Sequence, residues 1–482
     1  MSEEPLLISD VQTRVVAELQ RIAPVTSELG ARFSMAGEEL ALVGGPVRDA
    51  MLGRLQQDLD FTTSARPEVT ERLLKGWASA TWDIGRAFGT IGARRGEWQI
   101  EITTYRSEAY DPSSRKPAVQ YGDTLVGDLA RRDFTINSMA LVLPEERLED
   151  PYGGVVDLAH RLLRTPGRPE DSFSDDPLRM MRAARFSAQL GFTVAPEVVA
   201  AMRDMAERIT IVSAERVRDE LVKLLLAPDP VPGLRLLVET GLAAHVLPEL
   251  PALALERDEH HRHKDVYEHT LTVLQQSIEL EDRLAPLTGG GPDLVSRLAA
   301  LMHDVGKPRT RRFVEDGVVT FHHHDVVGAK LTRKRMQALR FSKDQIDAVA
   351  QLVEQHLRFH GYGSGEWTDS AVRRYVRDAG DQLERLHVLT RADCTTRNQR
   401  KADRLRRTYD DLEDRIERLS AEEELAAIRP DLDGNQIMEI LGVGPGREVG
   451  QAYRHLLELR LDRGPMSQDE ARQALLEWVG GR

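Results

Sequence analysis

The sequence is poor in cysteine and in long apolar runs, and each shortage excludes a class of protein. Cys394 is the one cysteine among 482 residues, which excludes an internal disulfide and a cysteine-cluster metal site. No apolar stretch approaches the ~20 uninterrupted residues that a membrane span needs. The first residues, which include Glu3 and Glu4, lack the basic flank and apolar core of a secretion signal. We therefore expect a cytoplasmic protein with no membrane partner.

A net positive charge is absent as well. The 65 basic and 78 acidic residues give a formal net charge of -13, whereas nucleic-acid binding depends on basic patches. A whole-chain average leaves room for local patches, and arginines are dense at 179–185 and 397–407. Charge alone argues against a nucleic-acid partner, so the motifs must decide.

The character of the chain changes near residue 165. Before that point, alternating or β-branched runs predict strands. One helix is expected before the first two of these strands and another after them. After it, apolar residues recur every three or four positions, as in 178–190 and 214–226, and predict helices. The expected strands are 40–43, 58–62, 89–94 and 98–105, and the expected early helices are 11–29 and 67–77. The chain exceeds one hydrophobic core, and we predict an α+β fold: a small mixed-sheet head followed by a long all-helical body.

Three acidic residues lie on the predicted strands of the head. Asp58 and Asp60 are two residues apart, so their carboxylates point to one face of the strand. Glu101 interrupts an apolar alternation and offers a third carboxylate from a neighbouring strand. Carboxylates that share a face repel unless a cation lies between them, and hard oxygen ligands favour Mg²⁺. A solvent-exposed strand edge also carries such a pattern, so this motif is weak by itself.

A glycine turn precedes these carboxylates. The apolar strand that ends at Val43 runs into Gly44 and Gly45 and then into a predicted helix that carries Arg48. Glycines let the backbone approach a phosphate, and a helix N-terminus adds donors and a favourable dipole. Arg48 can pair with phosphate oxygens in bidentate fashion. A phosphate-binding turn shortly before paired carboxylates predicts a nucleotide site.

These residues belong to a longer series of motifs. The strings are GGPVRD, DLDF, EITTYR, RRDFTINSMA (131–140), DPYGGVVDL (150–158) and DDPLRMMRAARF (175–186). In this order the series resembles the class II tRNA nucleotidyltransferases and bacterial poly(A) polymerases of the polymerase-beta superfamily. The resemblance covers roughly the first half of the chain. It implies a tRNA partner, the substrates CTP and ATP, and transfer without a nucleic-acid template.

The resemblance also implies roles for individual residues. Asp58 and Asp60 would hold two Mg²⁺ ions, with Glu101 as the third carboxylate. Gly44, Gly45 and Arg48 would form the triphosphate site. The residues that would hold the sugar and phosphates are Arg132, Asp133 and Asn137.

A repeat of one acidic and three basic residues follows near the start of the helical body. Asp176, Arg179, Arg182 and Arg185 are spaced by three on a predicted helix, which by itself reads as a solvated basic face. The resemblance implies that Asp176 accepts a hydrogen bond from the exocyclic amine of C and A, and that Arg179 donates to the ring nitrogen. The sequence departs from the family at Asp175, where glutamate is usual.

A second candidate site is rich in histidine. His269, His303, Asp304 and Asp393 occur in an order that resembles the HD-domain metal phosphohydrolases. His324 and His356 lie between them and are further candidate ligands. The resemblance implies a divalent metal and phosphatase, phosphodiesterase or 2′-nucleotidase activity, suited to trimming damaged tRNA ends. An HD fold that serves only as a scaffold or RNA contact remains the alternative.

Together these motifs predict four domains and a tRNA CCA-adding enzyme. The domains are a nucleotidyltransferase head (1–165), a helical neck with base recognition and RNA binding (166–255), an HD domain (256–420) and a C-terminal RNA-facing region (421–482). The segment 106–121 resembles the flexible loop of complete CCA enzymes, and no long basic extension follows. The alternatives are a poly(A) polymerase, a CC-only or A-only enzyme, and an HD phosphohydrolase with an RNA-binding head. No oligomeric state is predicted.

Overall fold

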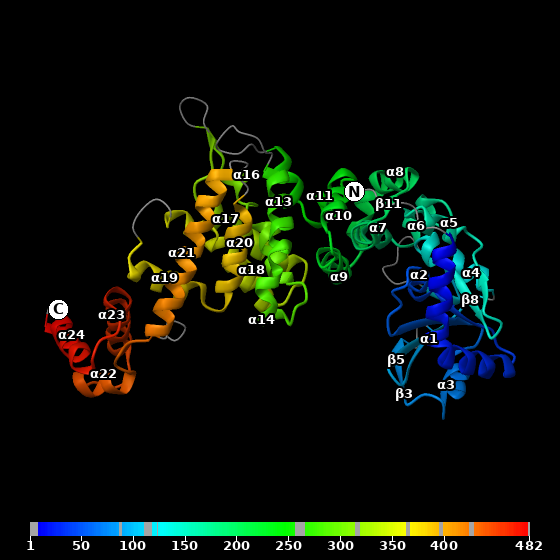
Figure 1. The fold of residues 1–482 in the computed structure, drawn as a ribbon, viewed down its shortest axis with the longest axis horizontal. Helices are drawn as coiled ribbons and strands as arrows, with labels where there is room; N and C mark the ends of the chain where they lie inside the picture. The colour runs from blue at the N-terminus through cyan, green and yellow to red at the C-terminus, as the bar shows by residue number, and fades with distance from the viewer. Residues whose placement is uncertain are drawn as a thin grey trace. The chain divides into compact units, whose positions relative to one another are not determined.

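The computed structural model describes most of the chain, which forms two compact units, Met1–Val246 and Leu247–Arg482 (Figure 1). None of the described helices is both long and apolar enough to cross a membrane. The finer division into four domains remains a prediction. The described residues are 8–85, 89–109, 118–122, 124–255, 266–313, 319–362, 367–394, 399–423 and 429–480.

The first unit contains a seven-stranded mixed sheet. Its strand order is β3-β4-β5-β2-β1-β8-β9. The central pair β2–β5 is parallel, and the other neighbours are antiparallel. The strands are β1 (Leu40–Val43), β2 (Asp58–Thr63), β3 (Ala80–Gly85), β4 (Thr90–Arg95), β5 (Trp98–Thr104), β8 (Ala140–Leu143) and β9 (Arg147–Glu149). The predicted mixed-sheet head is confirmed.

Side-chain alternation gives this sheet one buried and one acidic face. Leu59 and Phe61 of β2 are at most 1% exposed and point to the face against which α1 packs through β1 and β8. Asp58 and Asp60 alternate with them and are exposed on the opposite face, where Glu101 joins them from β5. Leu59 and Phe61 therefore pack on one side of the sheet and the acidic residues lie on the other, which also carries a buried cluster of Ala41, Val43, Leu129 and Ala140.

The remaining elements of the first unit are mostly helical. A β6–β7 hairpin follows the sheet, and β10–β11 form a short parallel ladder. The elements are α1 (Ile8–Met35), α2 (Gly45–Met51), α3 (Pro67–Leu74), β6 (Arg106–Ala109), β7 (Ala118–Tyr121), α4 (Leu125–Ala130), η2 (Thr135–Asn137), α5 (Gly154–Ala159), β10 (Leu162–Leu163), α6 (Pro169–Asp175), α7 (Leu178–Leu190), β11 (Thr193–Val194), α8 (Pro196–Met205), η3 (Ala206–Ile211), α9 (Ala214–Leu225), α10 (Val231–Glu239) and α11 (Leu242–Val246).

Within the residues of the second unit that the structure describes, all regular elements are helical except for the β12–β13 ladder. Helices α13, α15, α18 and α20 pack around one another, and α17 packs on α18. The last three helices share a small core of their own. The elements are α12 (Glu249–Ala252), η4 (Leu253–Leu255), α13 (Val266–Glu279), η5 (Glu281–Leu284), α14 (Ala285–Thr288), α15 (Leu294–Met302), α16 (Lys307–Thr310), β12 (Arg312–Phe313), β13 (Val319–Thr320), α17 (His324–Ala338), α18 (Lys343–Gln355), η7 (Arg358–Gly361), α19 (Asp369–Ala379), η8 (Gly380–Gln382), α20 (Leu383–Asp393), α21 (Gln399–Glu423), α22 (Gly434–Leu441), α23 (Arg447–Arg463) and α24 (Gln468–Gly480).

Candidate active site

On the acidic face, two adjacent strands carry the three predicted carboxylates. Asp60 of β2 is the register partner of Glu101 of β5, and Asp58 lies two residues before Asp60 on the same face. Although the side chain of Asp60 is accessible to solvent, the protein packed around it removes part of its hydration. This desolvation, then Glu101 and Asp58, raise the pKa of Asp60 to about 6, although Arg132 opposes them. A carboxylate with a raised pKa holds its charge at a cost, which a bound cation removes.

The three carboxylates do not converge on a single point. In the part of the chain that the structure describes, the sets of three ligand atoms within 4.8 Å of one another lie in the second unit, and this trio is not among them. Asp60 and Glu101 line a cavity, whereas Asp58 is not among its lining residues. Asp60 and Glu101 therefore face the cavity most directly.

The glycine turn lies against an arginine of the same cavity. Gly44 has φ +73°, a left-handed conformation that favours glycine, and a Cβ there would lie 2.8 Å from Nη1 of Arg132. Helix α2 begins at Gly45, and its Arg48 is buried with its guanidinium paired to Asp49. A side chain at Gly44 would therefore be strained by the backbone conformation and would displace the guanidinium of Arg132, which lies directly beside the turn.

One cavity of about 580 Å³ collects most of the predicted nucleotide site. Its walls come from β1, β2, β5, α7 and the segments before η2 and α7. The predicted residues that line it are Gly44, Gly45, Arg48, Asp60, Glu101, Arg132, Asp133, Asn137, Asp176, Arg179, Arg182 and Arg185. Residues separated by up to 141 positions in the sequence thus share one space.

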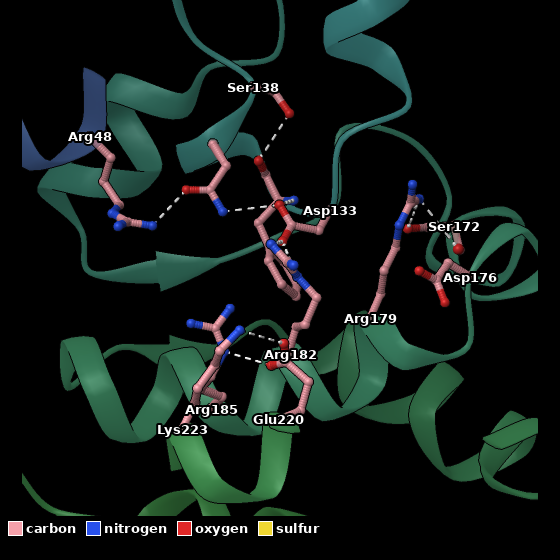
Figure 2. Close-up of polar contacts among 12 residues, drawn as sticks. Arg48, Asp133, Ser138, Ser172, Asp176, Arg179, Arg182, Arg185, Glu220 and Lys223 are labelled. Atoms are coloured by element: carbon pink, nitrogen blue, oxygen red, sulfur yellow. Dashed lines mark hydrogen bonds and ion pairs between the residues drawn. The ribbon is translucent and has the colours of Figure 1, made fainter. Parts of the chain in front are cut away.

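A chain of hydrogen bonds crosses this cavity, as Figure 2 shows. Arg48 Nη1 donates to Asn137 Oδ1 at 2.7 Å, and Asn137 Nδ2 donates to Asp133 Oδ1 at 2.9 Å. Arg182 Nε then donates to the other oxygen of Asp133 at 2.7 Å. Burial would raise the pKa of Asp133, but Arg182, Asn137 and Arg179 hold it near 2. The carboxylate is therefore ionised and orients both neighbours.

Phe186 joins three of the arginines and was not predicted as a site residue. The guanidiniums of Arg48, Arg182 and Arg185 lie 5.3, 5.6 and 4.0 Å from the centre of its ring. Such stacking fixes a planar cation in place. Arg185 also forms a buried ion pair with Glu220 of α9 at 2.6 Å (Figure 2).

Asp176 departs from the expected helical placement. It caps the end of α6 and precedes α7, so it does not share a helix face with Arg179 as the spacing predicts. Its Oδ1 accepts the backbone N–H of Leu178 at 3.0 Å, and its Oδ2 accepts from Arg216 of α9 at 2.7 Å. Arg179 instead donates to Ser172 Oγ at 2.9 Å. The break between the two helices nevertheless leaves both side chains in the cavity wall.

Asp128 is a second residue that sequence reasoning missed. It is completely buried, and its carboxylate accepts from Nη2 of Arg131 at 2.6 Å and from Nη2 of Arg132 at 3.2 Å. It also accepts from Thr62 of the acidic strand at 3.2 Å and from the backbone N–H of Arg106 at 3.3 Å. Asp128 therefore anchors the double arginine between the acidic strand and the hairpin. The middle of the segment 106–121, which resembles the flexible loop of complete CCA enzymes and includes Asp111, Arg115 and Pro117, lies outside the described residues.

The histidine-rich motif forms a buried cluster in the second unit. His269 Nε2 lies 2.9 Å from Asp393 and 3.6 Å from Asp304. Two sets of potential ligand atoms each lie within 4.8 Å of one another. One set is His269, His303 and Asp393, and the other is Asp304, His324 and His356. All six predicted residues thus meet in space.

Three of these histidines present the same ring nitrogen to the cluster. Nδ1 of His303, His324 and His356 lies 2.8, 2.8 and 2.6 Å from a backbone carbonyl. Their Nε2 atoms are buried without a hydrogen-bond partner among the described residues. An imidazole that donates from Nδ1 to a carbonyl carries its lone pair on Nε2, the usual arrangement of a metal ligand. The donor set therefore fits a divalent transition metal.

Charge within the cluster favours a cation. Burial and then His303 lower the pKa of His356 to about 4, so His356 is neutral near pH 7. Burial would also lower the pKa of His303, but Asp304 at 3.2 Å raises it to about 8. His303 and Lys307 in turn hold the pKa of the buried Asp304 well below its usual value. A metal ion would take the place of these protons.

Two residues support the cluster without having been predicted. Lys307 Nζ lies 2.9 Å from Asp304. A Cβ at Gly306 would lie 2.0 Å from the carbonyl oxygen of His324, so only glycine lets the two histidine-bearing segments approach. The signal in the sequence was the string HDVGK (303–307). The neighbouring His260, His261 and His263, expected to be a solvated group, lie outside the described residues.

Three family models match successive parts of the chain. They are the poly A polymerase head domain (residues 40–164), the probable RNA and SrmB-binding site of polymerase A (191–253) and the HD domain (266–398). An A-adding tRNA nucleotidyltransferase of Deinococcus radiodurans is 35% identical over 448 residues, 91% of this chain and 95% of the relative. A CC-adding tRNA nucleotidyltransferase of Thermus thermophilus is 34% identical over 449 residues, 91% and 94% of the two chains.

This chain belongs to the tRNA nucleotidyltransferase and poly(A) polymerase family. The fold of this nucleotidyltransferase also resembles solved structures. The Bacillus stearothermophilus CCA-adding enzyme in complex with CTP is 24% identical, with a TM-score of 0.65 and 94% and 96% of the two chains covered. The Thermotoga maritima CCA-adding enzyme in complex with tRNA is 18% identical, with a TM-score of 0.61 and 98% of each chain covered.

The arrangement gives this nucleotidyltransferase two separate chemical sites. The first combines carboxylates, arginines and a glycine turn in one cavity, which suits a nucleoside triphosphate. The second, within the matched HD domain, combines imidazoles and carboxylates, which suit a divalent transition metal such as Mn²⁺, Fe²⁺, Co²⁺ or Ni²⁺. Each site lies within a single unit of the chain.

Proposed function

We propose that this nucleotidyltransferase builds or repairs the 3′-terminal CCA of tRNA from CTP and ATP. The observation that carries the proposal is the meeting of a glycine turn, two carboxylate strands and the Asp176–Arg179 pair in one cavity. Its volume of about 580 Å³ lies within the ~300–1,000 Å³ of small-molecule sites. Two full-length relatives that each add part of the CCA end support the same chemistry.

Asp58, Asp60 and Glu101 would hold two Mg²⁺ ions. Their oxygen ligands and the raised pKa of Asp60 suit a hard cation. Magnesium held there would neutralise charge and lower the pKa of the attacking hydroxyl. The 3′-hydroxyl oxygen of the RNA forms a bond to the α-phosphorus, its proton is lost, and the bond between the α-phosphorus and its bridging oxygen breaks. Pyrophosphate leaves with the electron pair.

The arginines and Asp133 would bind the rest of the nucleotide. Arg132, beside the glycine turn, and Arg48 offer charged donors to the triphosphate. Asp133 and Asn137, which are hydrogen-bonded to each other, offer an acceptor and an amide to the ribose hydroxyls. Because Arg182 and Phe186 hold these groups in place, little reorganisation is needed when the nucleotide binds.

Asp176 and Arg179 would read the base. An acceptor beside a donor matches the exocyclic amine and ring nitrogen that C and A share, and U and G present the opposite pattern. Asp176 is held by Arg216, and Arg179 is held by Ser172. The pair is thus oriented by the protein before a base arrives.

The decisive experiment supplies tRNAs that end at the base before CCA, or in CC, with CTP and ATP separately and together. Sequencing of the products should show CCA on the first tRNA and A on the second. Addition of CC alone or of A alone would make this a specialised enzyme, as in its two full-length relatives, and a long A tail would make it a poly(A) polymerase. Asp58→Asn serves as the inactive control. A tRNA substrate is consistent with the cytoplasmic location expected from the sequence.

We also propose that the HD unit is a metal-dependent phosphohydrolase acting on RNA ends. Three buried Nε2 atoms form no hydrogen bond among the described residues, although those of His303 and His324 lie 3.2 and 3.4 Å from Asp304. They support this role, because a purely structural histidine usually has both nitrogens hydrogen-bonded. Metal analysis together with hydrolysis of a 2′,3′-cyclic nucleotide tests it. A protein that retains no metal and hydrolyses nothing would reduce the HD unit to a scaffold or RNA contact.

A further inference from the structure

A short cationic segment lies between two of the HD-cluster motifs. Residues 307–313 read Lys-Pro-Arg-Thr-Arg-Arg-Phe, with four cations and no acidic residue. Glu315 and Asp316 follow, so the stretch 307–320 keeps a charge of about +2 in a chain whose net charge is -13. Positive charge is therefore concentrated next to this site although the chain as a whole is acidic.

The side chains of this segment are exposed. Phe313 is 68% exposed, the second largest fraction among the large apolar residues that the structure describes. The guanidinium of Arg311 lies 4.7 Å from the centre of its ring. Arg309 and Arg312 are exposed and form no ion pair with any residue of the described ranges. We refer to Arg309, Arg311, Arg312 and Phe313 as the basic lip.

The segment that carries the basic lip is linked at both ends to the HD cluster, the six residues His269, His303, Asp304, His324, His356 and Asp393. At one end, Lys307 of α16 pairs with Asp304. At the other end, Arg312 of β12 is the register partner of Thr320 of β13, four residues before His324. Four residues span at most ~14 Å and one rung of a ladder adds ~5 Å, so the Cα of Arg312 lies within about 20 Å of that of His324. A few nucleotides of a single strand cover such a distance.

We propose that the basic lip binds the single-stranded 3′ end of an RNA and leads its terminal phosphate to the HD cluster. Exposed arginines attract backbone phosphates, and an exposed aromatic ring offers a stacking surface for a base of any sequence. An acidic peptide would use the arginines but would leave the exposed ring without a matching planar group. The combination of cation and ring therefore favours a nucleic acid.

This inference rests on the phosphohydrolase role proposed above. The RNA end that suits the cluster carries a 2′,3′-cyclic phosphate. One water molecule adds across one of the two ring P–O bonds. Its oxygen bonds to phosphorus, a proton passes to the released oxygen, and the products are a terminal phosphomonoester and one free hydroxyl. The lip contributes binding and not chemistry, so its residues are positioning residues.

The hydrolytic test compares a short single-stranded oligoribonucleotide that ends in a 2′,3′-cyclic phosphate with the cyclic mononucleotide. In the full-length protein, the double variant Arg309→Glu, Arg312→Glu and the variant Phe313→Ala should each lower kcat/KM for the oligonucleotide about tenfold or more, mainly through KM. The mononucleotide is too short to reach the lip, so its hydrolysis should not change. Equal losses on both substrates would overturn the proposal.

Two matched controls separate the lip from general effects. Lys330→Glu with Lys334→Glu makes the same change of charge on exposed residues of α17, six and ten residues beyond His324. Leu287→Ala removes another exposed apolar side chain, which is 50% exposed. Neither should alter the preference for the oligonucleotide.

A binding test shows whether the basic lip binds RNA even if the HD domain has no hydrolytic activity. The photo-reactive residue benzoylphenylalanine is placed at position 313 or, as control, at 287, and the full-length protein is irradiated with an RNA that carries a non-hydrolysable 3′ end. Cross-links at 313 that map near the 3′ end and fade with salt are expected. No cross-link above that at 287, or equally effective competition by an acidic peptide, would overturn the RNA assignment. Cross-links without hydrolysis would contradict only the phosphohydrolase proposal.

Discussion

Arg182 of α7 donates from Nε to Oδ2 of Asp133 at 2.7 Å and thereby connects α7, which also carries Arg179, to the predicted ribose site. Asp133→Asn should raise the KM for both CTP and ATP about tenfold or more, because Arg182 loses its counter-charge and the amide oxygen can accept from only one of the two donors, Arg182 and Asn137. Steady-state kinetics with each nucleotide checks this. Asp157→Asn, which alters a buried carboxylate outside the cavity lining, is the control. Unchanged KM values would contradict the assignment of Asp133 to the nucleotide site.

We expect Asp60 to lower the stability of the metal-free protein near pH 8 although nucleotide incorporation requires it. Its pKa is about 6 in the folded protein and 3.8 ordinarily, so a stabilising contribution present below pH 3.8 is lost as the pH rises through about 6. With chelator present, Asp60→Asn should therefore raise the unfolding temperature at pH 8, by roughly 2–4 °C for each kcal/mol gained. The gain should shrink between pH 6 and pH 4, and nucleotide incorporation should disappear. Asp204→Asn, an exposed carboxylate of α8, should show no such pH dependence.

Asp176 should control the choice of base. Asp176→Ala removes the acceptor for the exocyclic amine, and a good base contact gives ~1–3 kcal/mol, so preference for CTP over UTP should fall about 5- to 150-fold. Competition assays with CTP and UTP measure the ratio. Asp219→Ala, on the exposed side of α9 and paired with Arg218, provides a matched loss of carboxylate. An unchanged ratio would remove Asp176 from base recognition.

The HD cluster should bind metal in a pH-dependent manner. His356→Ala should lower metal affinity at least tenfold while CCA addition persists, because the two sites lie in different units. Since His303 has a pKa of about 8, its proton must leave when metal binds, and affinity in the unmodified protein should rise between pH 6 and pH 9. Calorimetric titration with Mn²⁺ or Ni²⁺ tests both points. His245→Ala, an exposed histidine of α11, should bind metal normally.

Glu220 should be important for the stability of the first unit. Its ion pair with Arg185 is buried, with side chains 5% and 10% exposed, and removal of one partner leaves an uncompensated charge. Glu220→Ala should therefore lower the free energy of unfolding by about 3–5 kcal/mol. Glu239→Ala breaks an exposed pair with Arg203 and should cost less than about 1 kcal/mol. Similar losses in urea unfolding of the two variants would show that burial of the pair is irrelevant.

Local periodicity was enough to predict much of the site. Two-residue spacing placed Asp58 and Asp60 on one face, and the polar interruption at Glu101 indicated the neighbouring strand, as the register now shows. The order of the HD motif likewise anticipated a cluster of all six residues. The shared face of Asp58 and Asp60 is set within a few residues of the chain, whereas the HD cluster spans residues 269–393 and was anticipated through the resemblance of its order to a known family.

Other contacts depend on pairings that a single sequence does not reveal. Arg216 meets Asp176 across 40 positions, and Glu220 meets Arg185 across 35. Asp128 reads as an ordinary helix residue until its three-dimensional neighbours are known. The spacing of three also suggested one continuous helix through Asp176, whereas the chain breaks there because Pro177 follows and disfavours a helical residue before it.

Every residue that lines the nucleotide cavity lies between Val43 and Arg216, inside the first unit. All the groups that we propose to select the nucleotide therefore lie in the first unit. A relative could lose or exchange the half of the chain after Val246 without losing any residue of this proposed site.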